Sequence, residues 1–540
     1  MRKLLALGAS ALAVLVLTAA AAAGIPGDGV ADDPSSQDAK LQALNADSPF
    51  AGASLESQAG AVRAERKARN ISLVGSLALG QQGGVVNADV AGYKNLAFVG
   101  KWRGLCPGTG VDIIDISRPS APAKIADTLD ASNTSMEDME ALRIGTRDVL
   151  GIGLQDCVGA GLPAGKEGFE LYDISRPGSP QLLSFFETAP SGVHELDLTT
   201  TPGGRTLALL ATPDREAITS DAAGLNGVGD LLILDITDPA NPTLVGEWGV
   251  LDEPELGLGF YLSVRQGADA RTQLHSVRAN ANGTRAYLSY WDGSFIMLDI
   301  SDPSNPEFLG LTGYGPDDEG NAHSVDEARG GNILVTADED GAPFEFEFTS
   351  NAFAGTRPAI EADFTSERIV NLPGREMAGE VVHVGRGCPA DPSLGLAAPD
   401  PYLADPAGKI ALIERGLCRF DNKIGRAQLA GASGVIVYNN AAGGEALVLM
   451  GGLDPVTLPD GTVVDVSIPA IFVQRSTGLA LAGGTPPVTA RAAAVFNGWG
   501  YMRIFDTSDP SNPVQLAEWH SPGTDDEARA TEGTCTIHNP

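Results

Sequence analysis

The stretch "FIMLDISDPSNP" (residues 295–306) decides the fold, because similar stretches recur along the chain. In each of them an apolar run ends on an aspartate and passes into a polar turn that contains proline. Asp and Ser side chains cap turns, and proline fixes φ and withholds a donor, so the pattern predicts a strand followed by a sharp turn. The related stretches are "VDIIDISRPSAP" (111–122), "FELYDISRPGSP" (169–180), "LLILDITDPANP" (231–242) and "MRIFDTSDPSNP" (502–513).

The aspartates that end the apolar runs define a period. They are Asp115, Asp173, Asp235, Asp299 and Asp506, at spacings of 58, 62, 64 and 207 residues. The last spacing equals one period plus an insertion of roughly 145 residues. Each period contains four short β-branched or alternating runs bounded by Gly, Pro, Asn and Asp, which predicts four strands. Four strands per repeat are typical of a β-propeller blade, whose strands we letter a to d from the innermost to the outermost.

The two ends of the chain extend this pattern. Residues 70–80, "NISLVGSLALG", resemble the outer strand "NPTLVGEWGV" (241–250), and residues 531–540, "TEGTCTIHNP", resemble the start of an innermost strand. We therefore expect a mainly β protein, a six-bladed propeller closed by both termini. Strands b and c of the sixth blade are absent from the sequence, which favours a truncated version of a longer protein.

The strand c runs, such as "LLILDITDP" and "FIMLDISDP", resemble those of the LVIVD-repeat family of exported proteins. The resemblance covers about residues 70–350 and 495–540 and rests on five copies. It implies a propeller-like repeat fold and implies little about activity.

The insertion interrupts the fifth blade between its strands b and c. Its core, "GKIALIERGLCRFDNKIGRAQLAGASGVIVYNN" (408–440), predicts a strand, a helix over about 422–430 and a second strand. This insertion resembles the protease-associated (PA) domain over about residues 376–485. The resemblance implies peptide binding or control of access to a site, without catalytic residues of its own. Its hallmark residues are Arg415, Gly416, Cys418, Phe420, Lys423, Ala427, Gly431, Ala432, Gly434, Ile468, Pro469 and Ala470.

The N-terminus and the cysteines predict export. "MRKLLALGASALAVLVLTAAAAAGIPG" (1–27) has the basic start, apolar run and small residues of a signal peptide, with no membrane span after it. In an oxidising compartment five cysteines predict two disulfides and one cysteine left over. The PA resemblance implies the pair Cys388–Cys418, and Cys106–Cys157 would join the b–c turns of blades one and two. We expect a secreted protein, with cell-surface association as a variant of this prediction.

The predicted organisation follows from these observations. It comprises a signal peptide (1–23), a flexible linker (24–69), most of the propeller (70–345), an insertion containing the PA domain (346–494) and the remainder of the propeller (495–540). The formal net charge of −33 argues against nucleic acid and anionic membranes as partners, because both are bound through Lys and Arg. The expected partner is a protein or peptide, and the oligomeric state stays open.

Four of the six histidines form the candidate site, since each opens a strand a: His194, His275, His323 and His538. Innermost strands line the channel of a propeller, so these imidazoles, supported by Glu195, Asp338 and Asp340, could hold calcium or a transition metal. The alternative is a repeated structural hydrogen bond between neighbouring strands. The other two histidines, His383 and His520, lie outside this pattern.

Two functions follow from the sequence. The leading one is a non-enzymatic secreted or cell-surface protein whose propeller presents a PA domain to a protein or peptide. We find no catalytic residues, because no G-x-S-x-G or H-E-x-x-H motif is present. The second is a metal-dependent hydrolase or lyase with its site in the histidine-lined channel and the PA domain gating entry. This gating rests on topology, since the d–a and b–c turns of a propeller share one face.

Overall fold

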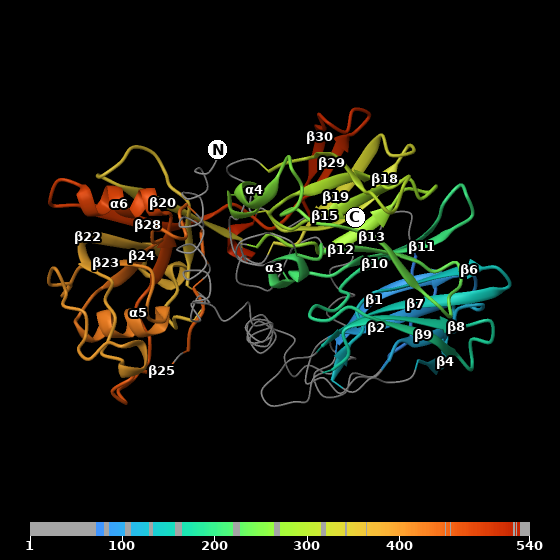
Figure 1. Cartoon of the computed structure of the whole chain (residues 1–540), viewed down its shortest axis with the longest axis horizontal. Helices are drawn as coiled ribbons and strands as arrows, with labels where there is room; N and C mark the ends of the chain where they lie inside the picture. The colour runs from blue at the N-terminus through green and yellow to red at the C-terminus, as the bar shows by residue number, and fades with distance from the viewer. Residues whose placement is uncertain are drawn as a thin grey trace, which may run out of the picture. The chain divides into compact units, whose positions relative to one another are not determined.

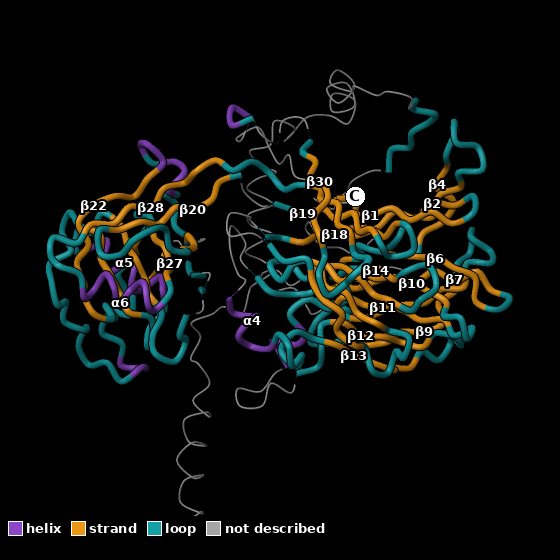
Figure 2. Tube along the Cα trace, turned by 90° about the horizontal axis from the view of Figure 1, so that it is seen from above, coloured by secondary structure: helices purple, strands orange, loops and turns teal. Residues whose placement is uncertain are grey.

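The chain divides into two compact units, which are described separately (Figures 1 and 2). Among the residues with described structure, one unit is Phe346–Ala494 and the other contains the remainder. The predicted signal peptide, Cys106, Cys157, Cys535 and His538 lie outside the described residues. The computed structural model describes residues 72–79, 86–102, 110–128, 133–156, 165–219, 227–263, 271–314, 320–340, 343–362, 364–445, 447–448, 450–453, 455–521, 524 and 526–529.

The larger unit is a propeller of antiparallel sheets, so the predicted mainly β, propeller-like fold is confirmed. Blade one is β1 (Val86–Tyr93), β2 (Leu96–Trp102), β3 (Asp112–Asp115) and β4 (Ala123–Asp127). Blade two is β6 (Met139–Ile144), β7 (Arg147–Asp156), β8 (Gly168–Asp173) and β9 (Gln181–Glu187), with the short β5 (Thr134–Ser135) also on β7. Blade three is β10 (Leu196–Thr200), β11 (Thr206–Ala211), β12 (Leu231–Asp235) and β13 (Thr243–Trp248). Blade four is β14 (Ser276–Ala279), β15 (Arg285–Ser289), β16 (Phe295–Asp299) and β17 (Glu307–Leu311). Blade five is β18 (Ala322–Ala328), β19 (Ile333–Asp338), β29 (Met502–Asp506) and β30 (Val514–Trp519).

The middle strands of the blades are buried on both faces. Leu209 of β11 belongs to a core cluster shared with blade four, whereas its neighbour Leu210 belongs to one shared with blade two. Side chains alternate between the two faces of a strand, so a run such as "TLALLA" (206–211) packs against both neighbouring blades. This is why strands b and c are nearly continuous in apolar residues.

The aspartates that revealed the period cap the turns that follow strand c. The Asp299 carboxylate accepts a hydrogen bond from the Ser301 N–H at 2.8 Å, and Asp235 accepts one from Thr237 at 2.9 Å. These side chains satisfy backbone donors where the strand ladder ends. The turn-capping role predicted from the sequence is therefore confirmed.

The predicted count of six blades is not confirmed. The described residues form five four-stranded blades, and no sixth sheet is found among them. Segment 72–79 lies beside blade one, where a Cβ on Gly75 would collide with the Pro119 carbonyl oxygen. Gly246 of β13 meets Pro303 of the next blade in the same way, so segment 72–79 occupies an outer-strand position. It forms no ladder in the described part of the chain, and the strand predicted to start its blade, 531–540, falls outside that part.

The insertion forms a single mixed sheet. Its order is β20 (Phe344–Ser350), β28 (Thr489–Phe496), β22 (Glu376–Gly385), β23 (Ile410–Glu414), β24 (Gly434–Tyr438), β27 (Ala470–Val473) and β21 (Ala359–Glu361). The pairs β22–β23, β23–β24 and β24–β27 are parallel. Helices α5 (Phe420–Leu429) and α6 (Arg475–Gly483) follow β23 and β27, and the hairpin β25 (Val456–Thr457) and β26 (Val463–Val464) lies between β24 and β27 in sequence.

Two short helices connect propeller strands: α3 (Arg215–Thr219) and α4 (Gly257–Ser263). In blade five, β19 pairs directly with β29, although the inserted sheet separates them in sequence. None of the helices in the described part of the chain has the length and hydrophobicity needed to span a bilayer.

Candidate functional site

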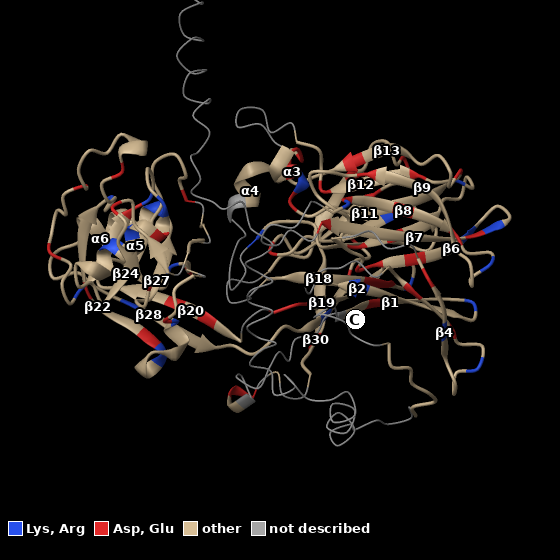
Figure 3. Cartoon of the chain, turned by 90° about the horizontal axis from the view of Figure 1, so that it is seen from below, with Lys and Arg blue, Asp and Glu red and all other residues tan. Residues whose placement is uncertain are grey.

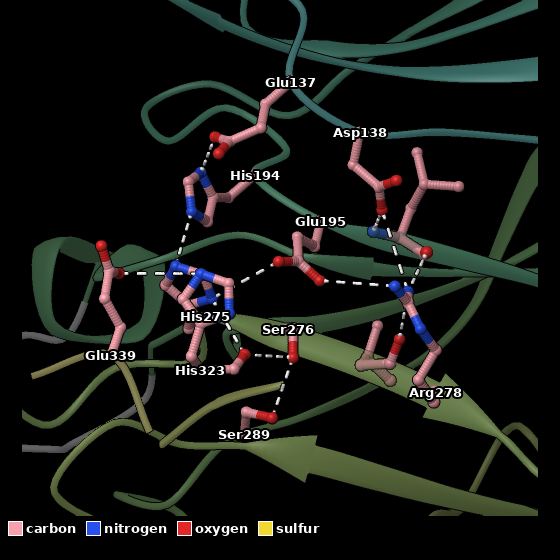
Figure 4. Close-up of polar contacts among 12 residues, drawn as sticks. Glu137, Asp138, His194, Glu195, His275, Ser276, Arg278, Ser289, His323 and Glu339 are labelled. Atoms are coloured by element: carbon pink, nitrogen blue, oxygen red, sulfur yellow. Dashed lines mark hydrogen bonds and ion pairs between the residues drawn. The ribbon is translucent and has the colours of Figure 1, made fainter. Parts of the chain in front are cut away.

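Three of the four histidines singled out from the sequence lie in contact at the start of strands a. His194 precedes β10, His275 precedes β14, and His323 is the second residue of β18. The ring centroids of His275 and His194 are 4.3 Å apart, and those of His275 and His323 are 4.2 Å apart. Their positions at equivalent points of adjacent blades bring residues 129 positions apart into one cluster, shown in Figure 4.

The ring nitrogens of this cluster face defined partners. His194 Nε2 lies 2.8 Å from His275 Nε2, and His194 Nδ1 lies 2.9 Å from Glu137 Oε2 and 2.9 Å from Gln155 Oε1. His275 Nδ1 lies 3.1 Å from the His323 carbonyl oxygen. The three imidazoles are nearly enclosed, with residue exposures of 9%, 6% and 5% for His194, His275 and His323.

Carboxylates complete the cluster, although not all of those expected. Glu195, 2% exposed, places Oε1 3.7 Å from His275 Nδ1. Ligand atoms of Glu195, His275 and His323 lie within 4.8 Å of one another, and in the described residues this is the only such group of three or more His, Cys, Asp or Glu. These three residues could therefore hold one metal ion.

The other predicted carboxylates are placed differently. Asp338 accepts a 2.6 Å hydrogen bond from Tyr314 and is ion-paired with Arg503, and it is not a member of the metal-competent group. Asp340 is buried and likewise is not a member. Between them, Glu339 lies 3.6 Å from His323 Nε2. Successive side chains of an extended segment point in opposite directions, so the middle acid of "DED" faces the histidine.

Farther along the strands a, after the histidines, lies a buried network of charged residues. Arg278 is the cation of this network, 3.7 Å from Glu195 Oε2 and 3.9 Å from Asp138 Oδ2. Burial alone would lower the pKa of Arg278, but Asp138, Glu195 and other carboxylates outweigh burial and raise it. Burial raises the pKa of Asp138 to about 6, and burial together with Asp197 raises the pKa of Glu140 to about 8.

A cavity of about 360 Å³ adjoins this network. It is lined by Asp89, Val90, Ala91, Gly92, Asp138, Met139, Glu140, Ala141, Arg278, Ser324, Val325 and Asp326, which come from blades one, two, four and five. The cavity therefore lies where the innermost strands of several blades converge. Figure 3 marks Asp and Glu in red along the strands of the propeller.

Sequence reasoning missed Glu137, Gln155 and Arg278. Glu137 stands where blade two offers "MEDMEAL" in place of a histidine-led strand, which was a usable signal. Arg278 pairs with Tyr287 in the same register that joins Asp197 to Leu209, so aligning the repeats by strand register would have placed it. Gln155 lies on strand b, and its sequence gives no comparable signal.

The hallmark residues of the insertion stabilise a loop. Cys388 and Cys418 form a disulfide, as the resemblance implied, with Cα atoms 5.7 Å apart. Buried Lys423 donates hydrogen bonds from Nζ to the carbonyl oxygens of Arg386 and Gly416, both at 2.8 Å. Phe420 packs edge-on against Phe472, with ring centroids 6.0 Å apart. Arg415 Nη1 donates to the Asn439 side chain at 3.3 Å, and Gly416 has a φ of 113°.

Replacing Lys423 with methionine is expected to destabilise this unit by about 1–3 kcal/mol, because two partly buried carbonyl oxygens lose the charged donor that they share. Lys409→Met serves as the control, since Lys409 pairs with Glu380 at the surface and such pairs contribute at most about 1 kcal/mol. Urea unfolding of both variants, followed by circular dichroism and by the fluorescence of Tyr402 and Tyr438, measures the losses. Equal losses in the two variants would contradict the role given to Lys423.

Comparison with known proteins assigns both parts of the chain. Residues 377–481 match the PA domain family, and residues 87–127, 227–249 and 280–311 match the LVIVD repeat. The chain carries LVIVD repeats and a PA domain. The LVIVD propeller and the PA domain expected from the sequence are both confirmed.

Among characterised proteins, partial similarity is to aminopeptidases. Leucine aminopeptidase 2 of Arthroderma otae is 29% identical over 199 residues, which cover 34% of this chain and 38% of that protein. Leucine aminopeptidase 2 of Trichophyton rubrum is 31% identical over 170 residues, which cover 30% and 31%. An aminopeptidase of Pseudomonas aeruginosa is 36% identical over 110 residues, which cover 19% of each chain. The chain thus spans well under half the length of these relatives.

Solved structures are similar only in part. A zinc aminopeptidase from Bacillus subtilis matches at 22% identity with a TM-score of 0.19, covering 32% of this chain and 36% of that chain. A hypothetical selenium-binding protein from Sulfolobus tokodaii matches at 12% identity with a TM-score of 0.31, covering 47% and 57%.

Proposed function

We propose that this protein is an exported LVIVD propeller that uses its PA domain to bind a protein or peptide segment. The observation that carries the proposal is a groove of about 590 Å³ on the PA sheet, within the smaller unit. It is lined by Thr349, Ser350, Asn351, Ala378, Gly379, Glu380, Thr489, Ala490 and Arg491 of β20, β22, β28 and the residue after β20. The Cys388–Cys418 disulfide supports an oxidising compartment, as export requires.

The lining of the groove suits an extended peptide. Ala378, Gly379 and Ala490 keep side-chain bulk low, so a peptide backbone can approach the sheet closely. Glu380 and Arg491 place opposite charges along the groove, where each already has a counter-charge in Lys409 and Glu376. The charges that line the groove are therefore already paired. Such a lining favours a ligand with polar peptide groups over a ligand with one strong charge.

Blocking the groove tests the proposal. Ala378 is exposed, so Ala378→Trp should fill the groove without disturbing the core and weaken binding of a fluorescent random-decapeptide pool at least tenfold, measured by anisotropy on the full chain. Ala441→Trp, in the exposed loop after β24, is the matched control and should bind as the wild type does. Equal binding by both variants would rule out this groove.

The second candidate function is that of a metal-dependent hydrolase or lyase with its site at the propeller axis. The observation that favours it is the grouping of Glu195, His275 and His323 beside a carboxylate-rich cavity. Turnover of a peptide pool that is lost in His275→Ala/His323→Ala, while peptide binding by the PA domain persists, would select this candidate. Unchanged turnover in that variant would reject it.

A further inference from the structure

The hydrogen-bond partners of the histidines indicate that the Nε2 atoms of His194 and His275 face each other as two acceptors. The Glu137 carboxylate only accepts hydrogen bonds, so His194 carries its proton on Nδ1, 2.9 Å away. The His323 carbonyl also only accepts, so His275 carries its proton on Nδ1, 3.1 Å away. In the neutral imidazoles both Nε2 atoms then present lone pairs, yet they lie 2.8 Å apart. A metal ion bound by these nitrogens, or a proton shared between them, makes this arrangement favourable.

We propose that His275, His323 and Glu195, together with His194 Nε2, hold one divalent transition-metal ion at the propeller axis. Nitrogen ligands at about 2.1 Å from one ion, and at roughly 90° to each other, lie about 3 Å apart, which is close to the 2.8 Å between the two Nε2 atoms. Three imidazoles and one carboxylate form a donor set that favours zinc, copper, nickel or iron, whereas calcium and magnesium prefer oxygen. The metal class is thus narrower than the calcium or transition metal that the sequence left open.

Outer contacts orient the proposed ligands. Glu137 lies against His194 Nδ1, and Ser276 Oγ donates a 2.6 Å hydrogen bond to the His323 carbonyl, the same oxygen that His275 Nδ1 faces (Figure 4). Ser276 Oγ also lies 2.8 Å from Ser289 Oγ. Hydrogen bonds to the second nitrogen of a ligating histidine fix its tautomer and orientation, and metal sites depend on them.

The surrounding charge also favours a cation. Glu195 links the cluster to the Arg278 network, where Asp138, Glu140 and Asp197 outnumber the one guanidinium. Those of the carboxylates that are ionised attract cations to the wall of the channel. Glu195 is 2% exposed and its Oε2 lies 3.7 Å from Arg278, so a metal ion at Oε1 would add a second counter-charge to a buried carboxylate.

Metal analysis of the full chain, purified without an immobilised-metal column, tests the proposal. We expect about one equivalent of a transition metal by plasma mass spectrometry, and re-binding of Co²⁺ by the chelator-treated protein with a visible absorption band. His275→Ala/His323→Ala should lose both signals. The control variant His383→Ala/His520→Ala removes two imidazoles outside the cluster and should keep both.

Two further variants protect the test against misfolding. Glu195→Gln preserves shape and should weaken Co²⁺ binding by about 10- to 100-fold with unchanged circular dichroism. Glu137→Gln should weaken it less, because Glu137 acts through His194. A folded wild type that neither contains nor binds a transition metal overturns the proposal, and so does undiminished binding by Glu195→Gln. In the metal-free case a proton shared between His194 and His275 would explain the short contact. The test is independent of the peptide groove, whose binding assay needs no metal.

Discussion

Replacing Arg503 with methionine is expected to lower the free energy of unfolding of the propeller by about 3–5 kcal/mol. Arg503 of β29 is ion-paired with Asp338 at the end of β19, and both residues are buried, with 4% and 2% exposure. Tyr314 donates a hydrogen bond to the same carboxylate at 2.6 Å. Methionine has a similar length and no charge, so the variant leaves Asp338 as a buried, uncompensated anion.

Urea unfolding with matched variants isolates this effect. Arg205→Met removes a partly exposed pair with Asp235 and should cost at most about 1 kcal/mol. The double variant Arg503→Met/Asp338→Asn should recover much of the stability lost by Arg503→Met, because no charge is then left buried. A single-variant loss no larger than that of Arg205→Met would show that Asp338 is not held by Arg503.

Glu216→Gln is expected to stabilise the propeller above neutral pH by up to about 3 kcal/mol. Glu216 of α3 is 1% exposed, and burial raises its pKa from 4.5 to about 7. Because the folded state holds this proton more tightly than the unfolded chain, the contribution is complete below pH 4.5 and is lost as pH rises through about 7. Glutamine cannot ionise, so the variant escapes that loss.

The hydrogen bonds around Glu216 are compatible with glutamine. One oxygen accepts from the Leu251 N–H at 2.7 Å, and the other lies 3.2 Å from Tyr290 Oη, which is itself 3.0 Å from Asp230. A glutamine amide can keep the first contact and donate in the second. Thermal unfolding from pH 4.5 to 8 should show a flatter profile than the wild type, whereas the exposed-site control Glu187→Gln should follow the wild type. Parallel profiles for Glu216→Gln and wild type would contradict the prediction.

The sequence supported the repeat and the insertion because both rest on local physics. A run ending on Asp299 predicts a capped turn wherever the rest of the chain lies, and the carboxylate does cap Ser301. The Cys388–Cys418 disulfide joins residues 30 positions apart, and it was expected from the resemblance to the PA domain and not from local spacing.

The partners of the histidines could not be predicted so directly. Glu339 rather than Asp338 faces His323, which depends on how the chain leaves β19. Glu137 and Arg278 reach the cluster and its network through blade-to-blade packing, and that packing is set by register across blades. The blade count depended on the terminal residues, whose strand partners a repeat pattern cannot supply.

The close approach of glycines to neighbouring turns bears on where a propeller of this kind can accept an inserted domain. Gly246 and Gly310 admit the turn prolines Pro303 and Pro510 of the following blades, as Gly75 admits Pro119. Consecutive blades therefore make a close contact at their outer strands, in addition to the cores that they share: a glycine of one strand d packs against a proline of the next c–d turn. The connection between strands b and c takes no part in this outer contact. A whole domain can therefore be inserted there, as between β19 and β29, without disturbing these contacts between blades.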